Sequence, residues 1–251
     1  MQYRPFGNTG FNVSALGFGT MRLPVIDGDA GNVDRPEAIR IIRHALDHGV
    51  NYADSGYTYH NEQSEVVLGE ALQDGYRERV KVATKLPTWL VEKQDDVERL
   101  LDNQLERLQT DHIDFYLVHN LNSVLWPVAC KHDVISALER AREKGKIGHI
   151  GFSFHDSFAL FKEIVDAYPG WEFVQLQYNY VNETEQAGTQ GLEYAASKGL
   201  PVVVMEPLLG GCLANPPEDV LEVFSESCCA DRSPVEWALQ WLWNRPEVTT
   251  V

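Results

Sequence analysis

The sequence predicts an α/β fold: a (β/α)8 barrel of the TIM type, preceded by an N-terminal β-hairpin. Two observations support this. Eight short apolar segments, rich in β-branched and aromatic residues, alternate with segments of helical periodicity along the 251 residues. The apolar segments are continuous, as strands covered on both faces of a parallel sheet should be. Eight such units in a chain of this length match the barrel, whose active sites form at the carboxyl ends of the strands.

The elements follow in order along the chain. The N-terminal stretch MQYRPFGNTGFNVSALG predicts a hairpin that turns between Gly7 and Gly10, and we expect it to plug the bottom of the barrel. The eight strands are predicted in SALGFG from Ser14, NYAD from Asn51, VKVAT from Val80, DFYLV from Asp114, HIGFS from His149, EFVQL from Glu172, PVVVM from Pro201 and the terminal VTTV.

Helical faces separate these strands. They are formed by Ile39, Ile42 and Leu46, by Val97, Leu101, Leu105 and Leu108, and by Val134, Leu138 and Ala141. Two N-terminal signals strengthen the assignment: DRPE at Asp34, and SPVE at Ser233, a capping box with proline at the first helical position. No linker or low-complexity stretch interrupts the pattern, so residues 1–251 are predicted to form a single domain, truncated at or just after strand eight.

A doubly wound parallel sheet is the main alternative fold. Its dinucleotide fingerprint, G-x-G-x-x-G, is missing, because Gly17 and Gly19 are followed by Arg22 where the third glycine should stand. The barrel is therefore the preferred prediction.

Composition narrows the classes of function. The net charge is 21 − 37 = −16, which argues against nucleic-acid binding. The cysteines (Cys130, Cys212, Cys228 and Cys229) have no framework spacing and are expected to be free thiols in a reducing compartment. With no signal sequence and no apolar run that could span a bilayer, we expect a cytoplasmic protein without a membrane partner.

Six successive predicted strands, the second to the seventh, deliver polar residues to one rim of the barrel. They are Asp54, Lys85, His119, Ser153, the pair Gln175 and Gln177, and Glu206. Asp54 and Lys85 lie on adjacent strands, where an ion pair is plausible. A lysine beside a phenol favours the phenolate and so eases proton donation. With a histidine to orient a carbonyl oxygen, this set suits carbonyl reduction. No metal-ligand spacing is present, so the hydride is expected from a nicotinamide cofactor.

The sequence resembles the aldo-keto reductases over essentially the whole chain. Asp54 ends strand two in YADSGYTY, Tyr59 follows five residues later, and SEVVLGEAL begins at Ser64. Lys85 in VKVATKLP and His119 in DFYLVHN complete the family's catalytic set. The resemblance implies an NAD(P)H-dependent oxidoreductase that reduces aldehydes or ketones, with Tyr59 as general acid.

The resemblance also implies a cofactor site. Ser153 and Gln175 would hold the nicotinamide carboxamide, and Asp54 would contact the ribose. The loop PLLGG would wrap the pyrophosphate through Pro207, Leu208 and Gly210. Two family positions differ. Met205 stands where many members stack a tyrosine on the nicotinamide, and Phe154 replaces an asparagine whose role His155 could take. NADP is the expected cofactor, with NAD possible.

The predicted substrate is a small carbonyl compound, with walls formed by Met21, Tyr57, Trp89 and Trp126. GFSFHD and MEPLLGG resemble a bacterial branch that often carries an additional C-terminal iron–sulfur domain, but the chain has no cysteine cluster of that kind. The alternative function is a non-catalytic regulatory or sensor module that binds the nicotinamide cofactor. The substrate's identity and the oligomeric state are not predicted.

Overall fold

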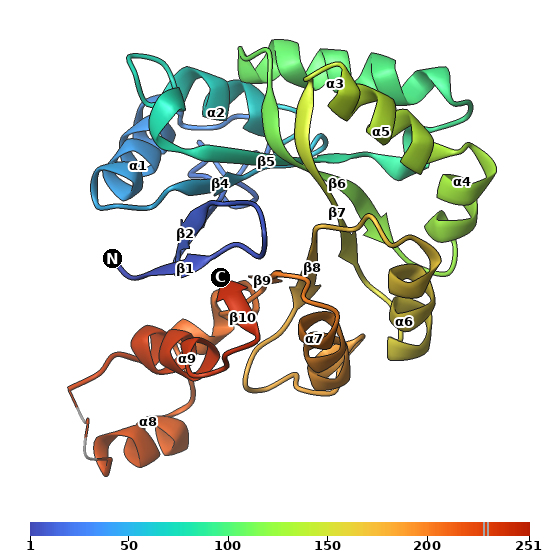
Figure 1. The fold of residues 1–251 in the computed structure, drawn as a ribbon. Coiled ribbons are helices and arrows are strands. Elements are labelled where there is room, and N and C mark those ends of the chain that lie inside the picture. Colours follow the sequence, from blue (N-terminus) through green and yellow to red (C-terminus); the bar gives the residue numbers. More distant parts are fainter. Residues whose placement is uncertain (228, 230) are drawn as a thin grey trace.

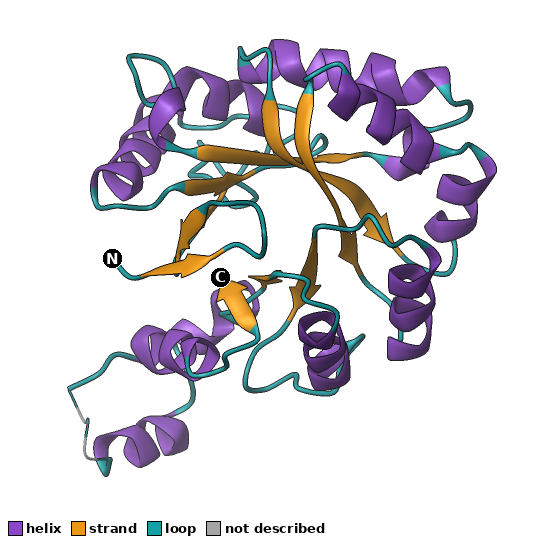
Figure 2. Ribbon diagram, in the orientation of Figure 1, coloured by secondary structure: helices purple, strands orange, loops and turns teal. Residues whose placement is uncertain are grey.

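A computed structural model describes residues 1–227, 229 and 231–251 of the chain (Figure 1). Parallel strands form a curled inner sheet, and helices lie outside it (Figure 2). The predicted free thiol of Cys228 lies outside the described residues. Among the described helices, none combines the length and apolar character needed to cross a membrane.

The predicted barrel strands are confirmed as an eight-stranded sheet in which each strand is parallel to its neighbours in chain order. They are β3 (Phe18–Gly19), β4 (Tyr52–Asp54), β5 (Lys81–Leu86), β6 (Ile113–Leu121), β7 (Ile147–Phe154), β8 (Phe173–Gln177), β9 (Val202–Met205) and β10 (Val248–Thr250). Two backbone hydrogen bonds join the sheet's ends: Gly17 N donates to Val251 O at 2.7 Å, and Val251 N donates to Ala15 O at 3.2 Å.

Helices follow the strands, and most of them cover the outside of the sheet. The helices are α1 (Arg35–Asp47), α2 (Ser64–Ala71), α3 (Asp95–Leu108), α4 (Leu125–Lys131), α5 (Val134–Glu143), α6 (Phe158–Ala167), α7 (Gly188–Ser197), α8 (Glu218–Ser225) and α9 (Pro234–Trp243), with short 3₁₀ pieces η1 (Arg77–Arg79), η2 (Thr88–Leu90) and η3 (Leu209–Ala214). Helix α8 has no buried residue and lies away from the sheet (Figure 1). Both predicted caps are confirmed: the Asp34 side chain accepts from Glu37 N, and Ser233 forms a full capping box with Glu236.

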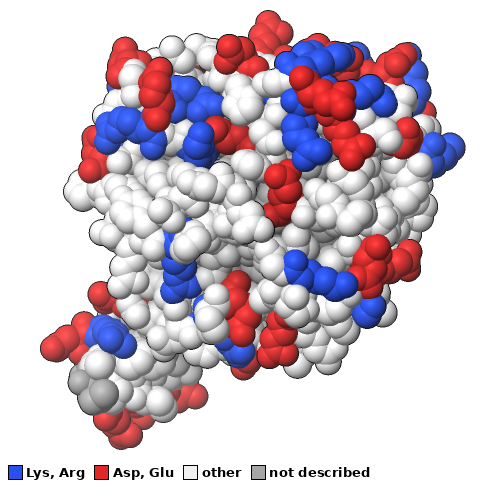
Figure 3. Space-filling view, viewed as in Figure 1, with Lys and Arg blue, Asp and Glu red and all other residues white. Residues whose placement is uncertain are grey.

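Charged side chains cover the helical layer. Figure 3 shows acidic and basic groups interspersed over the helices on the visible face, and the middle of that face mostly uncharged. On this face the acidic side chains therefore lie among basic ones. Many of these neighbouring charges form salt bridges, such as those of Lys146 with Glu98 and Asp102.

The N-terminal hairpin pairs β1 (Tyr3–Pro5) with β2 (Asn12–Ser14) in antiparallel fashion. The predicted turn is confirmed, and the left-handed φ values of Gly7 (53°) and Gly10 (73°) explain why glycine stands there. Phe6 is fully buried, and its ring packs 4.5 Å from that of Phe115 and 5.6 Å from that of Phe173. Because these partners lie in the amino-terminal halves of their strands, the hairpin plugs the bottom of the barrel.

Replacing Phe6 by alanine is expected to lower the free energy of unfolding by about 3–5 kcal/mol, since it leaves a cavity inside the barrel. Urea denaturation measures the effect. Phe11→Ala is the matched control on the same hairpin, because Phe11 is only partly buried and packs at the edge of the same cluster. An equal loss in the two variants would contradict a central role for Phe6.

Candidate active site

Lys85 and Asp54 form a buried ion pair at the carboxyl ends of β4 and β5. Asp54 pairs with Ala83 in the parallel ladder, so Lys85 lies two residues further along its strand and reaches back. Its Nζ donates to Asp54 Oδ1 at 2.5 Å, to the Ser55 carbonyl at 2.6 Å and to the Tyr59 hydroxyl at 3.2 Å. The three protons of the ammonium group therefore each have an acceptor.

The Lys85 ammonium is 1% exposed, yet it remains charged at neutral pH. Burial lowers its pKa, but the neighbouring Asp54 carboxylate and Tyr59 phenol raise it by more, so the net pKa lies above the ordinary value for lysine. The site thus keeps a permanent positive charge beside a phenol.

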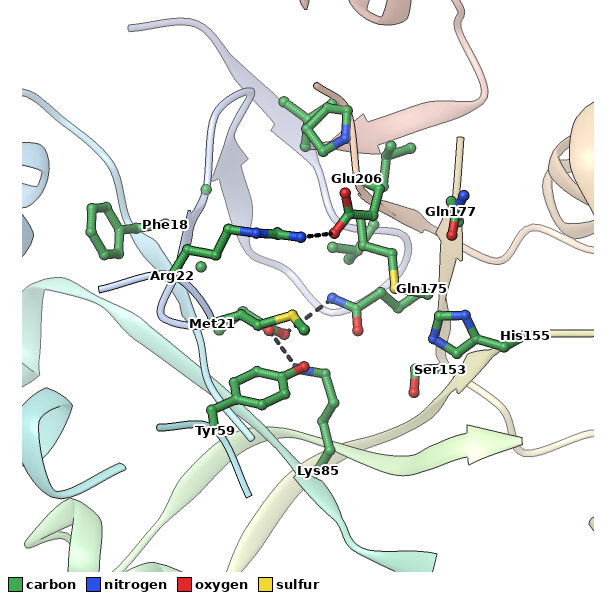
Figure 4. Close-up of a pocket in the computed structure, with 18 of the residues that line it drawn as sticks. Phe18, Met21, Arg22, Tyr59, Lys85, Ser153, His155, Gln175, Gln177 and Glu206 are labelled. Carbon is green, nitrogen blue, oxygen red and sulfur yellow. Dashed lines mark hydrogen bonds and ion pairs between the residues drawn. The ribbon is translucent and has the colours of Figure 1, made fainter. Parts of the chain in front are cut away.

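Tyr59 lies in the loop after β4, and its ring folds back over Gly56. A Cβ on residue 56 would meet Tyr59 Cζ at 2.8 Å, so glycine is required for this approach. The phenol oxygen accepts its hydrogen bond from Lys85, which leaves the phenol's own proton free to point into the cavity (Figure 4). The ring meets that of His119 edge-on, with centroids 6.0 Å apart.

His119 is 8% exposed near the end of β6, and the Trp89 ring packs 5.1 Å from its own. Burial, followed by the charge of Lys85 and the neighbouring His155, lowers the pKa of His119 well below its ordinary value. The imidazole is therefore neutral at neutral pH. A neutral imidazole keeps one N–H, with which it can donate a single hydrogen bond.

These groups surround a cavity of about 770 Å³ at the carboxyl ends of the strands. The predicted site residues that line it are Met21, Asp54, Tyr59, Lys85, Trp89, His119, Ser153, Gln175, Met205, Pro207 and Gly210. The fold thus brings together most of the predicted residues on one rim, from β4 round to β9.

One wall of the cavity suits a primary carboxamide. Ser153 and Gln175 are directly opposite each other in the ladder between β7 and β8, and both are buried. Ser153 Oγ accepts from Asn120 N at 2.8 Å, so its O–H remains available to donate. Gln175 Nε2 donates to Asp54 Oδ2 at 3.2 Å, whereas its Oε1 accepts no hydrogen bond from any residue that the structure describes. A free donor beside a free acceptor matches the oxygen and the NH₂ of a nicotinamide carboxamide.

The loop after β9 has an unusual backbone that suits a close approach of a ligand. Leu209, Gly210 and Gly211 have φ values of 47°, 65° and 97°, and the first two line the cavity. Leu208 does not line it. Its carbonyl instead accepts from Gly211 N at 2.9 Å and Leu213 N at 3.1 Å, which folds the loop tightly.

Two residues predicted for the substrate pocket, Tyr57 and Trp126, do not line this cavity. Tyr57 and Trp126 are each 8% exposed and belong to the apolar core between sheet and helices, away from the cavity. The Tyr57 ring lies under the Arg107 guanidinium, whose carbon is 4.1 Å from the ring centroid. Tyr57 is in a loop whose side-chain directions are set by the packing of α3 behind it, and Trp126 is on the buried side of α4, neither of which follows from sequence position alone.

Several lining residues were not predicted to bind anything. Arg22, from the loop after β3, pairs with Glu206, after β9, at 2.8 Å across the cavity mouth (Figure 4). Asn120 and Gln177 also line the cavity. Gln177 and Glu206 were visible as polar residues at strand ends, and Asn120 follows the predicted histidine, so position at the rim was the signal that could have identified them.

Comparison with known proteins identifies the family of the chain. The Aldo/keto reductase family model matches residues 15–251. An L-galactose dehydrogenase of Arabidopsis thaliana is 30% identical over 226 residues, which cover 87% of this chain and 69% of that protein. The holo form of an aldo-keto reductase from Bacillus halodurans superposes with a TM-score of 0.82 at 27% identity, covering 100% of this chain and 85% of its own.

A second solved structure, an aldo-keto reductase from Klebsiella pneumoniae in complex with NADPH, has the same fold. Its TM-score is 0.81 at 22% identity, with 100% of this chain and 84% of that chain covered. The family model covers nearly the whole chain, and the barrel of the relatives is the barrel described above. The chain belongs to the aldo-keto reductase family of oxidoreductases.

Proposed function

We propose that this protein is an NADP-dependent reductase of aldehydes or ketones. One observation supports the proposal above the others: the Tyr59 hydroxyl lies 3.2 Å from a buried, charged Lys85 in a cavity that Asp54 and His119 also line. A phenol that accepts from an ammonium group and keeps its own proton is arranged as a proton donor.

In the proposed reaction, a reduced nicotinamide held in the cavity would supply the hydride for the carbonyl carbon. The electron pair of the C=O double bond moves to oxygen, and Tyr59 gives that oxygen its proton. Lys85 stabilises the phenolate that remains, because its ammonium already donates to the phenol oxygen. Asp54 holds Lys85 in place and charged. The neutral His119 donates a hydrogen bond to the carbonyl oxygen and orients it.

The cofactor would be held by the residues whose polar atoms are free. Ser153 and Gln175 would bind the carboxamide, Met205 would pack on the nicotinamide ring, and Pro207 and Gly210, which line the cavity, would follow the pyrophosphate. Asp54 would contact the ribose. NADP is proposed rather than NAD because a structural relative was crystallised with NADPH. His155, which also lines the cavity, would assist at the carboxamide.

The substrate is proposed to be a small carbonyl compound that rests against Met21 and Trp89, which are 52% and 39% exposed at the cavity mouth. Because the site takes residues from every strand between β4 and β9, residues 1–251 are proposed to act as one domain. A cytoplasmic location is proposed as well.

The competing function is a sensor that binds the cofactor without turnover, favoured by the flexible Met205 in place of a stacking aromatic ring. Two measurements separate them. We expect NADPH to quench the tryptophan fluorescence of the protein, because Trp89 lines the cavity. We also expect steady-state oxidation of NADPH when members of a panel of aldehydes and ketones are added. If NADPH quenches the fluorescence but no compound of the panel oxidises NADPH, the sensor function is supported and the reductase function is contradicted. If neither quenching nor oxidation occurs, both proposed functions are contradicted.

A further inference from the structure

The loop that carries Tyr59 has a backbone that needs external support. The three residues after Tyr59, namely His60, Asn61 and Glu62, have left-handed φ values of 52°, 49° and 70°. None of them is glycine, so each is in an unfavourable conformation that persists only when surrounding contacts impose it. What holds this loop therefore decides where the Tyr59 hydroxyl lies.

Arg107 of α3 holds the loop on both sides of Tyr59. Its Nη1 donates to the Tyr57 carbonyl at 3.3 Å, and its guanidinium stacks on the Tyr57 ring. Its Nη2 donates to the Glu62 carboxylate, at the far end of the left-handed run. The Arg107 side chain is 15% exposed, and its Nη1 also lies 3.6 Å from Glu65 Oε2. A planar guanidinium with several donors in fixed directions is suited to such a two-point attachment.

The same helix holds the strand end that carries Lys85. Gln104 lies three residues before Arg107 on α3 and is fully buried. Its Nε2 donates to the Lys85 carbonyl at 3.1 Å and to Glu65 Oε1 at 2.5 Å. Its Oε1 accepts from the Tyr116 hydroxyl at 2.6 Å, which fixes the direction of the amide.

One helix thus contacts the main chain on both sides of the pair that would carry out proton transfer. Gln104 reaches the backbone of Lys85, and Arg107 reaches the backbone two residues before Tyr59. A rigid helix between the two contacts sets their separation. Neither side chain lines the cavity, so neither touches substrate or cofactor.

We propose that Arg107, supported by Gln104, is a positioning residue that fixes the 3.2 Å separation of the Tyr59 hydroxyl and Lys85 Nζ. This inference rests on the proposed reductase function. It assigns catalytic importance to a side chain on the helix side of the sheet, outside the active-site cavity.

The test is Arg107→Met, which keeps an unbranched apolar stem but removes the guanidinium group and its donors. We expect kcat per cofactor-binding site to fall by about 10- to 100-fold, since misplacing a catalytic group by about 1 Å can cost that much. The KM of the carbonyl substrate and the Kd of NADPH should change by less than about threefold, because no binding group has been altered. Arg107→Lys should fall between wild type and Arg107→Met.

Two further readouts separate positioning from a general loss of folding. With NADPH deuterated at the transferred position, the isotope effect on kcat should rise in Arg107→Met, because the chemical step becomes slower than product release. A smaller folded fraction would leave that isotope effect unchanged. Hydrogen exchange should accelerate at the backbone amides of residues 56–64.

Arg77→Met is the matched control. Arg77 is also a partly buried arginine that donates to a carboxylate, Asp114, and to two carbonyls, His112 and Val80, at 2.8–3.0 Å. It lies at the amino ends of β5 and β6, opposite the cavity. We expect a lower midpoint of thermal unfolding, with kcat per site, the isotope effect and exchange at residues 56–64 as in wild type.

Wild-type kcat and isotope effect in Arg107→Met would overturn the inference, as would equal effects of the two arginine variants. An inactive wild-type protein would instead count against the proposed function. In that case the exchange experiment still decides whether Arg107 holds the loop.

Discussion

Tyr59→Phe should lower the turnover of aldehydes and ketones by about 100- to 10,000-fold, the range typical for removing a positioned general acid. The ring would still fold over Gly56, so the loop and the cavity keep their shape. What is lost is the proton donor and the oxygen that accepts from Lys85. The Kd of NADPH should stay within about threefold of wild type, because the proposed carboxamide partners are Ser153 and Gln175.

Steady-state oxidation of NADPH, with the enzyme concentration taken from cofactor binding, measures this effect. Tyr57→Phe is the matched control, since it removes a phenol oxygen two residues away whose ring lies in the core and does not line the cavity. It should keep kcat near the wild-type value. A Tyr59→Phe variant with full activity would show that another group protonates the carbonyl oxygen.

Lys85→Met is expected to impair both catalysis and folding. Removing the ammonium leaves the Ser55 carbonyl buried without its partner and the Asp54 carboxylate with only the Gln175 amide. Breaking a buried ion pair on one side typically costs about 3–5 kcal/mol of stability. We also expect kcat to fall by at least about 100-fold, because the phenolate left by proton donation loses its stabilising charge. Denaturant titration and steady-state kinetics measure the two losses separately.

Lys81→Met is the control for this second prediction. Lys81 begins the same strand and pairs with Asp114 at 2.7 Å, but its side chain is 45% exposed. Because the buried Asp114 keeps its ion pair with Arg77 in this variant, and because Lys81 is partly in water, we expect a loss of about 0–1 kcal/mol. Near-normal kcat and a small loss of stability are therefore expected. If both lysine variants lost equal stability, burial of the Lys85–Asp54 pair would not explain the cost.

The pH dependence of this stability follows from the raised pKa of Lys85. A lysine whose pKa is higher in the folded state contributes stability that is fully present below its unfolded pKa, about 10.4. That contribution is lost only as the pH rises through the still higher folded pKa. Lys85→Met lacks this contribution. The resulting difference in the free energy of unfolding between wild type and Lys85→Met should thus be constant from about pH 6 to about pH 9.

Much of the candidate site could be predicted because a parallel barrel places the ends of its strands on one rim. Once VKVATKLP and DFYLVHN are identified as strands, Lys85 and His119 must reach the same rim as Asp54. The hairpin plug was predictable for a similar reason, since the glycines of its turn are required by local backbone geometry.

Other features depend on contacts between segments far apart in sequence. Tyr57 lies in the core because Arg107 of α3 stacks on its ring, and Trp126 lies in the core because it is on the buried side of α4, which packs against β6 and α5. Nothing in their local sequence distinguishes them from Tyr59 and Trp89. Likewise, Gln104 and Arg107 look like ordinary residues of an amphipathic helix until that helix is seen to contact the backbone beside Lys85 and Tyr59.

The sequence by itself determined the barrel, the hairpin and the rim on which Asp54, Lys85 and His119 stand, because strand order and residue period decide these. Only the tertiary structure decided how close the Tyr59 phenol lies to the Lys85 ammonium, which side-chain donors and acceptors are left free for a ligand, and which helix holds the loop. Those choices depend on distances of a few ångströms between elements whose relative positions are set by the packing of the whole barrel.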